Sequence, residues 1–242
     1  EHGKRKGTKR DILFFTDDDC QVHPRALSFL AEDFQDPQVD GVVGLLAESC
    51  PYGNFCSQFK NLWMHFTYRR QPRRVGLFFT SAAAIRREVF RQEGGFDIHY
   101  RGASITEDIE FGQRLLGKDY MIVMDQRLTV EHQKHYKEVF LLPEELRRAR
   151  GLVQTYVRNR LSGEQRAHYA SVPWFFGAGV GALGLGTLLL LVGLITGWGA
   201  FLWGALVMVL TALVLNASFL LALGRWRGPV FLAQSAGFLL LD

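Results

Sequence analysis

The chain has 242 residues, of which 48% are hydrophobic, and it carries a formal net charge of +4. This length allows one large domain or two small ones. The positive charge comes without a groove-reading motif or an aromatic stacking platform, which excludes nucleic acid as the expected partner. The three cysteines show no C-x-x-C spacing, so the pattern excludes a disulfide framework and is typical of a reducing compartment.

The first predicted element is a buried strand at residues 11–15, and it is followed at once by Asp17, Asp18 and Asp19. Because side chains alternate along an extended chain, Asp17 and Asp19 share one side while Asp18 points to the other. Paired carboxylates suit Mg²⁺ or Mn²⁺, and in open α/β sheets ligands bind at the carboxyl ends of strands. An acidic turn that caps the helix after Pro24 explains the same residues.

The pattern after this turn alternates between helices and strands, which predicts an α/β fold. Proline opens the first helix, and β-branched residues mark the strand that follows it. In chain order we expect a helix at 24–34, a strand at 39–47, a helix at 54–70, a strand at 76–85, a helix at 86–92, a turn at 94–97, a helix at 106–117, and strands at 120–124 and 128–131.

The last of these helices begins with Thr106-Glu107-Asp108. Ser104 and Glu107 fit an S-x-x-E capping box, and the helix dipole favours acidic residues in a first turn. The dipole also lowers the pKa of a carboxylate placed there, which weakens it as a base. Taken alone, the motif indicates helix capping.

Charge ends near residue 171, because all but two of the 28 lysines and arginines and all but one of the 24 acidic residues lie before Val172. The uncharged run that follows is too long for one bilayer span and fits two. We expect spans at 172–196 and 200–223, joined at Gly197-Trp198-Gly199, and 229–241 can be a truncated third span.

Arginines flank the two predicted spans, whereas the turn between them has none. The positive-inside rule therefore predicts a multi-pass protein of the cell membrane (inner or plasma membrane) whose soluble domain is cytoplasmic. A buried hairpin in a soluble protein is the alternative, but the preceding domain is too small to cover it. We expect a partial soluble domain at 1–138, basic interfacial helices at 139–171 and a transmembrane region at 172–242.

The basic segment at 139–160 is amphipathic and contains Arg147 and Arg150. Such a helix can lie in the membrane interface, with lipids as partners, or pack on the domain as an ordinary surface helix. The chain has no initiator methionine and opens only a few residues before a core strand, so we expect that its true beginning is missing.

Four features stand in order: the strand that ends in Asp17-Asp18-Asp19, the small residues from Ser81 to Ala84, the turn at 94–97, and Thr106-Glu107-Asp108. Over residues 1–160 this order resembles the inverting, metal-dependent family 2 glycosyltransferases. That family holds cellulose, chitin and hyaluronan synthases and the polyprenyl-phosphate glycosyltransferases. The resemblance implies an α/β GT-A fold with a mixed sheet, followed by α-helical transmembrane segments.

The resemblance also implies roles for individual residues. Asp17 and Asp19 would hold the metal that bridges the donor diphosphate, and Asp108 would be the general base, with Glu107 supporting it near the acceptor. Gln21 joins the metal ligands by similarity to the D-A-D-L-Q-H-P-P stretch of polyprenyl-phosphate glycosyltransferases. The residues expected to bind substrate are Asp18, Ser81, Asp97, Arg114, His132, Arg147 and Arg150; a structural role explains His132 equally well.

The expected function is metal-assisted transfer of a sugar from a nucleotide-diphospho-sugar to a lipid-linked or glycan acceptor by a membrane-anchored enzyme using Mg²⁺ or Mn²⁺. The Gln and Trp of the Q-x-x-R-W motif are absent around Arg147, which argues against a long-polymer synthase. One alternative is a catalytically inactive, membrane-tethered protein that binds nucleotide-sugars, although the intact Asp108 argues against it. The other is a Mg²⁺-dependent phosphohydrolase, whose usual pattern needs Thr or Val where Gln21 stands.

Overall fold

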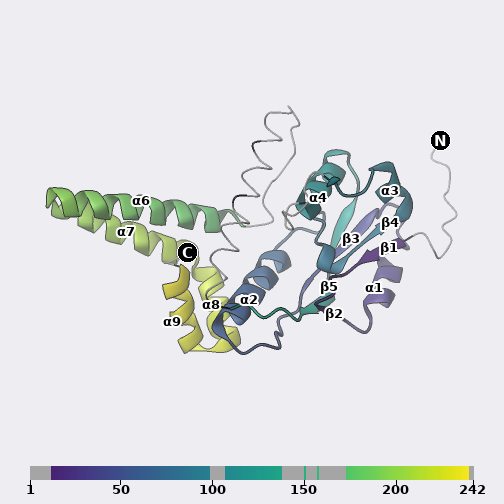
Figure 1. The fold of residues 1–242 in the computed structure, drawn as a ribbon, viewed down its shortest axis with the longest axis horizontal. Helices are drawn as coiled ribbons and strands as arrows, with labels where there is room; N and C mark the ends of the chain where they lie inside the picture. The colour runs from purple at the N-terminus through teal and green to yellow at the C-terminus, as the bar shows by residue number, and fades with distance from the viewer. Residues whose placement is uncertain (1–11, 99–106, 138–149, 151–156, 158–172, 240–242) are drawn as a thin grey trace. The chain divides into compact units, whose positions relative to one another are not determined.

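The chain divides into two compact units, Glu1–Ser171 and Val172–Asp242. The first holds a mixed sheet with helices, and the second is helical (Figure 1). The structure is a computed structural model, and it describes residues 12–98, 107–137, 150, 157 and 173–239.

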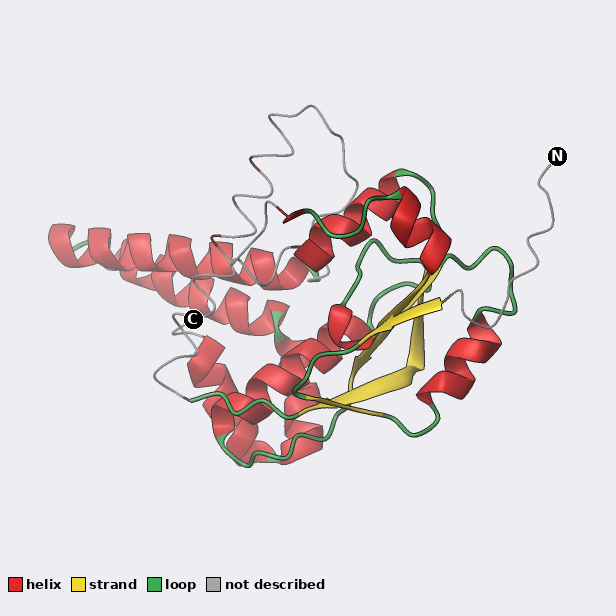
Figure 2. Ribbon diagram, turned by 45° about the vertical axis from the view of Figure 1, so that its right-hand side comes forward, coloured by secondary structure: helices red, strands yellow, loops and turns green. Residues whose placement is uncertain are grey.

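The first unit is built on a five-stranded mixed sheet, drawn in yellow in Figure 2. Its strands are β1 (Ile12–Phe15), β2 (Cys20–Val22), β3 (Gly41–Leu46), β4 (Ala83–Arg86) and β5 (Ile122–His132). The strand order is β1-β4-β3-β5-β2; β3 and β5 pair in parallel, and the other pairs are antiparallel. It follows that β1, β3 and β5 run in one direction, so their carboxyl ends lie at one edge of the sheet.

Helices cover both faces of this sheet. They are α1 (Ala26–Asp33), α2 (Phe55–Arg69), the 3₁₀ turn η1 (Thr80–Ala82), α3 (Arg87–Gln92) and α4 (Glu107–Gly117). Successive residues of β3 point to opposite faces. Val42 packs in a buried cluster with Leu30 of α1, whereas Val43 packs in a second cluster with Met64 of α2 and Phe111 of α4. The sheet therefore has α1 on one side and α2, α3 and α4 on the other.

The predicted strand at 76–85 is wrong over most of its length, because only Ala83–Arg86 is a strand. The backbone before it packs against α4, where Gln113 Nε2 donates a hydrogen bond to the carbonyl of Gly76 at 2.9 Å. Leu77, Phe78 and Phe79 are all buried. The apolar run at 76–85 indicates that the segment is buried. Both a strand and an irregular core segment can be buried, so the run does not distinguish between them.

The carboxyl half of the sheet also differs from the prediction. The two expected strands at 120–124 and 128–131 are one strand, β5, whose pairing with β3 shifts register between Val43 and Leu45. The irregularity is stabilised by Asp125, whose Oδ1 accepts hydrogen bonds from the Arg127 backbone at 2.8 Å and from its Nε at 3.1 Å. The short strand β2, which pairs with the end of β5, was not predicted at all.

The second unit consists of α6 (Trp174–Thr196), α7 (Gly199–Leu215), α8 (Ala217–Arg227) and α9 (Pro229–Leu239). By length and composition, α6 can cross a membrane, and the bent pair α7 and α8 makes a second candidate if it counts as one span. Gly197 ends α6 with φ of +70°, a conformation that favours glycine, so the turn predicted at 197–199 is present.

The predicted span at 200–223 is not one continuous helix. It breaks at Asn216, and α7 and α8 are bent by 59°. Asn216 Nδ2 donates to the carbonyl of Ala212 at 2.9 Å, a side-chain bond that competes with regular helix geometry. The 17 residues of α7 alone rise about 25 Å, less than the roughly 30 Å of a bilayer core. The third predicted span, 229–241, appears as the 11-residue α9, which is too short to cross, and residues 240–242 lie outside the described part.

Glycines let α6 and α7 approach closely. Gly179, Gly186 and Gly193 are buried and recur every seven residues along α6. A Cβ on Gly193 would lie 2.7 Å from Leu202 Cδ2, and one on Gly179 would lie 2.5 Å from Asn216 Nδ2. The rest of the α6 surface is largely exposed and apolar.

Candidate active site

The three aspartates lie at the carboxyl edge of the sheet. The residues from Thr16 to Asp19, called the acidic turn below, connect β1 to β2, which stand at opposite ends of the strand order. The turn must therefore cross the ends of the strands between them. Asp17 and Asp19 are partly buried and Asp18 is exposed, in keeping with the alternation that the sequence predicts.

The acidic turn is held by residues from β4 and β5. Ser81, just before β4, donates a hydrogen bond from Oγ to Asp17 Oδ2. His132, the last residue of β5, places Nε2 at 3.4 Å from Asp19 Oδ2. The backbone N–H of Gln133 donates to the carbonyl of Asp19 at 2.6 Å. Two of the predicted substrate-binding residues, Ser81 and His132, thus lie beside the two aspartates predicted to bind metal.

A divalent cation fits the donors gathered here. Asp19, Cys20 and His132 each offer one ligand atom, and these atoms lie within 4.8 Å of one another. Oxygen, nitrogen and sulfur together form a set that first-row divalent metals accept. Burial is the main cause that lowers the pKa of His132, which keeps the imidazole neutral near pH 7 and its ring nitrogen able to bind a cation. Burial, reinforced by the charges of Asp17 and Asp19, raises the pKa of Cys20 to about 12.

Cys20 is the member of this group that the sequence did not indicate. Its position follows from β2, since the ladder pairs Cys20 directly with His132. A prediction of β2 as a strand would have placed the two together. Gln21, the third predicted metal ligand, is exposed on β2 and pairs with Glu131 in the ladder, and its metal role stays a prediction.

Asp108 lies in the first turn of α4 and is partly buried. Its Oδ1 accepts a hydrogen bond from the backbone N–H of Ile109 at 2.7 Å. Burial is the main cause that raises the pKa of Asp108 to about 7, and the negative charges of Glu107 and Asp17 act in the same direction. The sequence argument from the helix dipole predicted a lowered pKa, and it was wrong because loss of water outweighs the backbone hydrogen bonds.

The influence of Asp17 on Asp108 shows that α4 and the acidic turn are electrostatic neighbours. Glu107 precedes Asp108, and its Oε2 is buried without a hydrogen-bond partner among the described residues. A carboxylic acid whose pKa lies near neutrality can both take up and release a proton at physiological pH. The arrangement therefore brings a candidate proton acceptor near a candidate cation site.

A cluster of phenylalanines joins the two halves of the site. Phe15 of β1 lies just before the acidic turn, and Phe111 of α4 lies one helical turn after Asp108. Between them stands Phe96, whose ring centroid is 5.6 Å from that of Phe15 and 5.1 Å from that of Phe111. Phe78 and Phe90 complete the set with edge-on contacts to Phe111 at 5.1 and 5.5 Å. We call these five residues the Phe cluster.

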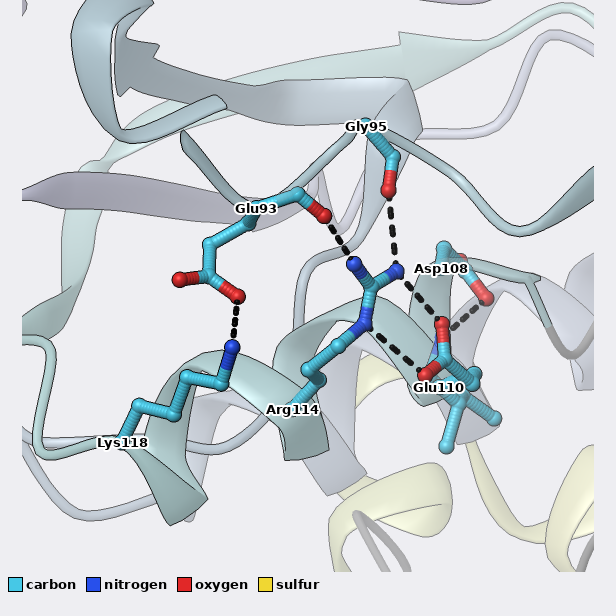
Figure 3. A network of polar contacts seen from close by, with 7 residues as sticks. Glu93, Gly95, Asp108, Glu110, Arg114 and Lys118 are labelled. Carbon is cyan, nitrogen blue, oxygen red and sulfur yellow. Dashed lines mark hydrogen bonds and ion pairs between the residues drawn. The ribbon is translucent and has the colours of Figure 1, made fainter. Parts of the chain in front are cut away.

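Arg114 of α4 contacts the turn that contains Asp97, as Figure 3 shows. Its guanidinium donates to both carboxylate oxygens of Glu110, at 3.0 and 2.8 Å, and to the backbone carbonyls of Glu93 and Gly95. Asp97 itself is partly buried in this turn. The substrate-binding roles of Asp97, Arg114 and Asp18 stay predictions.

The structure describes one of the two predicted site residues of the basic segment. Arg147 lies outside the described residues, while Arg150 is described and exposed. Ser104 of the predicted capping box also lies outside the described residues, as does Thr106. The interfacial role of this segment stays a prediction.

Comparisons with known proteins identify a family. A family model described as "Glycosyl transferase family group 2" matches residues 12–223. Among solved structures, the chain is similar to the mannosyltransferase PcManGT from Pyrobaculum calidifontis in complex with GDP-Man and Mn²⁺, at 16% identity and a TM-score of 0.45. That alignment covers 94% of this chain and 55% of the length of the mannosyltransferase. No curated protein matches the chain.

Proposed function

The chain belongs to glycosyl transferase family group 2, and from this premise we propose that it transfers a sugar from a nucleotide-diphospho-sugar to an acceptor with Asp108 as the general base. Family membership over residues 12–223 makes the chain a glycosyltransferase of GT-A fold. The base, the metal, the inverting stereochemistry and the membrane anchor are the parts we add.

The proposal is carried by the family match over residues 12–223 together with the place of Asp108 in the first turn of α4, where burial raises its pKa to about 7. A general base works best when its pKa lies near the operating pH. An ordinary surface aspartate is a much weaker base, because its pKa is close to 3.9. Asp108 also lies near the acidic turn, where a diphosphate would be held.

Asp17 and Asp19 are the residues that would hold Mg²⁺ or Mn²⁺, with His132 beside them. Cys20 lies in the same group, but its raised pKa keeps it a thiol, which is a poor ligand for these cations. When bound, such a cation would neutralise the negative charge that develops on the leaving diphosphate. Ser81 orients the Asp17 carboxylate through its hydrogen bond. His132 Nε2 lies 3.4 Å from Asp19 Oδ2, so the imidazole and this carboxylate face the same candidate cation site.

Asp108 takes the proton from the acceptor hydroxyl as that oxygen attacks the anomeric carbon from the face opposite the diphosphate. Direct displacement forms the new glycosidic bond, breaks the bond to the diphosphate and inverts the anomeric centre. Glu107 lies beside Asp108 and raises its pKa, which strengthens the base. No covalent intermediate with the protein is required by this scheme.

The membrane anchor is the last part of the proposal. Support comes from α6, which is long and apolar enough to span and whose spanning window is only 17% buried. A membrane anchor would bring a lipid-linked or glycan acceptor to an enzyme that faces the cytoplasm, as the arginine distribution predicts. The three-part division at residues 138 and 171 belongs to the same proposal.

The test is sugar transfer by the full chain in detergent, with donors first chosen by their Mn²⁺-dependent protection against heat unfolding. Asp108→Asn is expected to lower kcat by roughly 10² to 10⁴ while donor protection is retained. Asp19→Ala is expected to lose the Mn²⁺-dependent part of that protection. Retained transfer in Asp108→Asn would reject Asp108 as the base, and donor binding without turnover in the unchanged chain would favour the inactive binding protein.

A further inference from the structure

Three contacts at neighbouring positions hold α4 in place. Phe111 is fully buried in the Phe cluster, and Gly112 lies so close to the segment from Gly76 to Phe78 that a Cβ would stand 2.7 Å from its backbone. The third contact is Arg114, which joins α4 to the turn after α3 (Figure 3).

Arg114 donates hydrogen bonds from all three nitrogens of its guanidinium group. Both carboxylate oxygens of Glu110 accept from it within the helix, and the Arg114 side chain is only 18% exposed. Its remaining donors reach the carbonyls of Glu93 and Gly95 outside the helix. Gly94 and Gly95 have φ of +73° and +70°, so the turn takes a shape that directs these carbonyls toward α4 and that few other residues adopt.

Glu93 fixes the other end of the same turn. Its carboxylate accepts from Lys118 Nζ at 2.7 Å and from the Tyr120 hydroxyl at 3.2 Å, and its side chain is 5% exposed. The turn is therefore attached to the last turn of α4 by Arg114 and just beyond the carboxyl end of the helix by Lys118. These two attachments differ in one respect, since only Arg114 also bonds a residue, Glu110, within the turn of helix that carries Asp108.

We propose that Arg114 is a positioning residue for the general base: its fork holds the first turn of α4 against the turn at 94–97 and so keeps Asp108 at a fixed depth beside the acidic turn. This inference rests on the proposed role of Asp108. It replaces the substrate contact that the sequence suggested for Arg114, because protein partners already use Nε and both terminal nitrogens.

The property that matters is the planar guanidinium group of Arg114, which donates to several acceptors at once. Lysine keeps the charge but presents a single point donor, so it cannot bond Glu110 and two carbonyls in this geometry. A small displacement of a catalytic group can cost on the order of 10²-fold in rate. Arg114→Lys is therefore expected to lower kcat by about that factor, with the donor KM and the donor protection against heat unfolding nearly unchanged.

The pH profile separates positioning from general loss of stability. The charged groups near Asp108 are Glu107 of its own helix and Asp17 of the acidic turn, and burial is the largest influence on its pKa. If the first turn of α4 loosens and water reaches Asp108, its pKa falls. The acidic limb of the kcat profile should then move to lower pH in Arg114→Lys and, by a smaller amount, in Glu110→Gln.

Lys118→Met is the matched control, because it breaks the other attachment of the same turn and leaves every bond of Arg114 in place. It should lower the melting temperature without moving the pH limb. The inference is overturned if Arg114→Lys keeps its kcat and pH limb, or if Lys118→Met moves the limb equally. Asp108→Asn is run in parallel: if it retains transfer, the proposed function fails, whereas loss in Asp108→Asn with normal Arg114 variants rejects only the positioning role.

Discussion

The two halves of the candidate site are held by different forces. The α4 half rests on buried packing, with the Phe cluster, the close approach of Gly112 and the Arg114 fork around one helix. The acidic turn rests on a few polar contacts at the sheet edge, from Ser81, His132 and the backbone of Gln133. The proposed base is therefore held by the core of the fold, whereas the candidate cation site is held by a few polar side chains at the sheet edge.

Removing the shared packing should have the largest effect. Phe111 is fully buried and contacts Phe78, Phe90 and Phe96. Phe111→Ala is expected to lower the free energy of unfolding by about 3–5 kcal/mol, because it leaves a cavity in the cluster. Chemical denaturation measures this loss. A loss below that range would mean that the cluster closes over the gap and does not fix α4.

Gly112→Ala tests the close approach of α4 to the backbone of Gly76, Leu77 and Phe78. Alanine normally stabilises a helix interior relative to glycine by up to about 1 kcal/mol. Here its Cβ would meet the Leu77 and Phe78 backbone at 2.7 Å, so we expect a net loss of about 1–3 kcal/mol and a fall in transfer rate. Gly117→Ala in the same helix is the matched control, since a Cβ there meets nothing within 4 Å.

Ser81→Ala weakens only the polar half. The Oγ bond to Asp17 orients a carboxylate predicted to bind metal. Removing such an outer contact typically costs roughly 10- to 100-fold in metal affinity. Titration of Mn²⁺-dependent protection against heat unfolding measures the change, with unaltered stability in the absence of metal. An unchanged Mn²⁺ titration would show that Asp17 is oriented by something other than Ser81.

A further prediction concerns how stability depends on pH. The pKa of Asp108 is raised in the fold, so this group favours folding while it is protonated, and its contribution is lost as pH rises from about 4 through about 7. Asp108→Asn should therefore unfold at the same temperature as the unchanged chain at pH 4 and at a higher temperature at pH 8. Asp119→Asn serves as the control, because its side chain is 95% exposed. Equal shifts in both variants would argue against a buried charge at Asp108.

The sequence predicted much of the fold because its signals were local. Proline, the acidic turn and the glycine pair marked the helix at 26–33, the end of β1 and the turn at 94–97 close to where the structure has them. The sheet was harder. β2 has three residues, and nothing in Cys20 to Val22 indicates a strand until the end of β5 is present to pair with it.

The predictions about the site divide in the same way, into those that local sequence signals support and those that depend on the packed fold. The positions of Ser81 and His132 beside the aspartates agree with what the family resemblance implied, although their roles stay predictions. The direction of the Asp108 pKa could not be deduced from the helix dipole, because burial depends on side chains that reach α4 from β1, α3 and the turn at 94–97. The break at Asn216 was missed because a hydropathy pattern registers an apolar run and ignores one amide that bonds its own helix.

The Phe cluster also bears on how the site comes into being. Phe15 and Phe111 are separated by most of the described sequence of their unit and meet through Phe96. Contacts between such distant segments form late in folding, because the entropy of closing a long loop is lost before the packing energy is gained. As the chain leaves the ribosome, the acidic turn emerges well before α4 exists. Proton transfer and diphosphate binding should therefore become possible together, in one cooperative step, and a chain arrested before residue 111 should bind no donor productively.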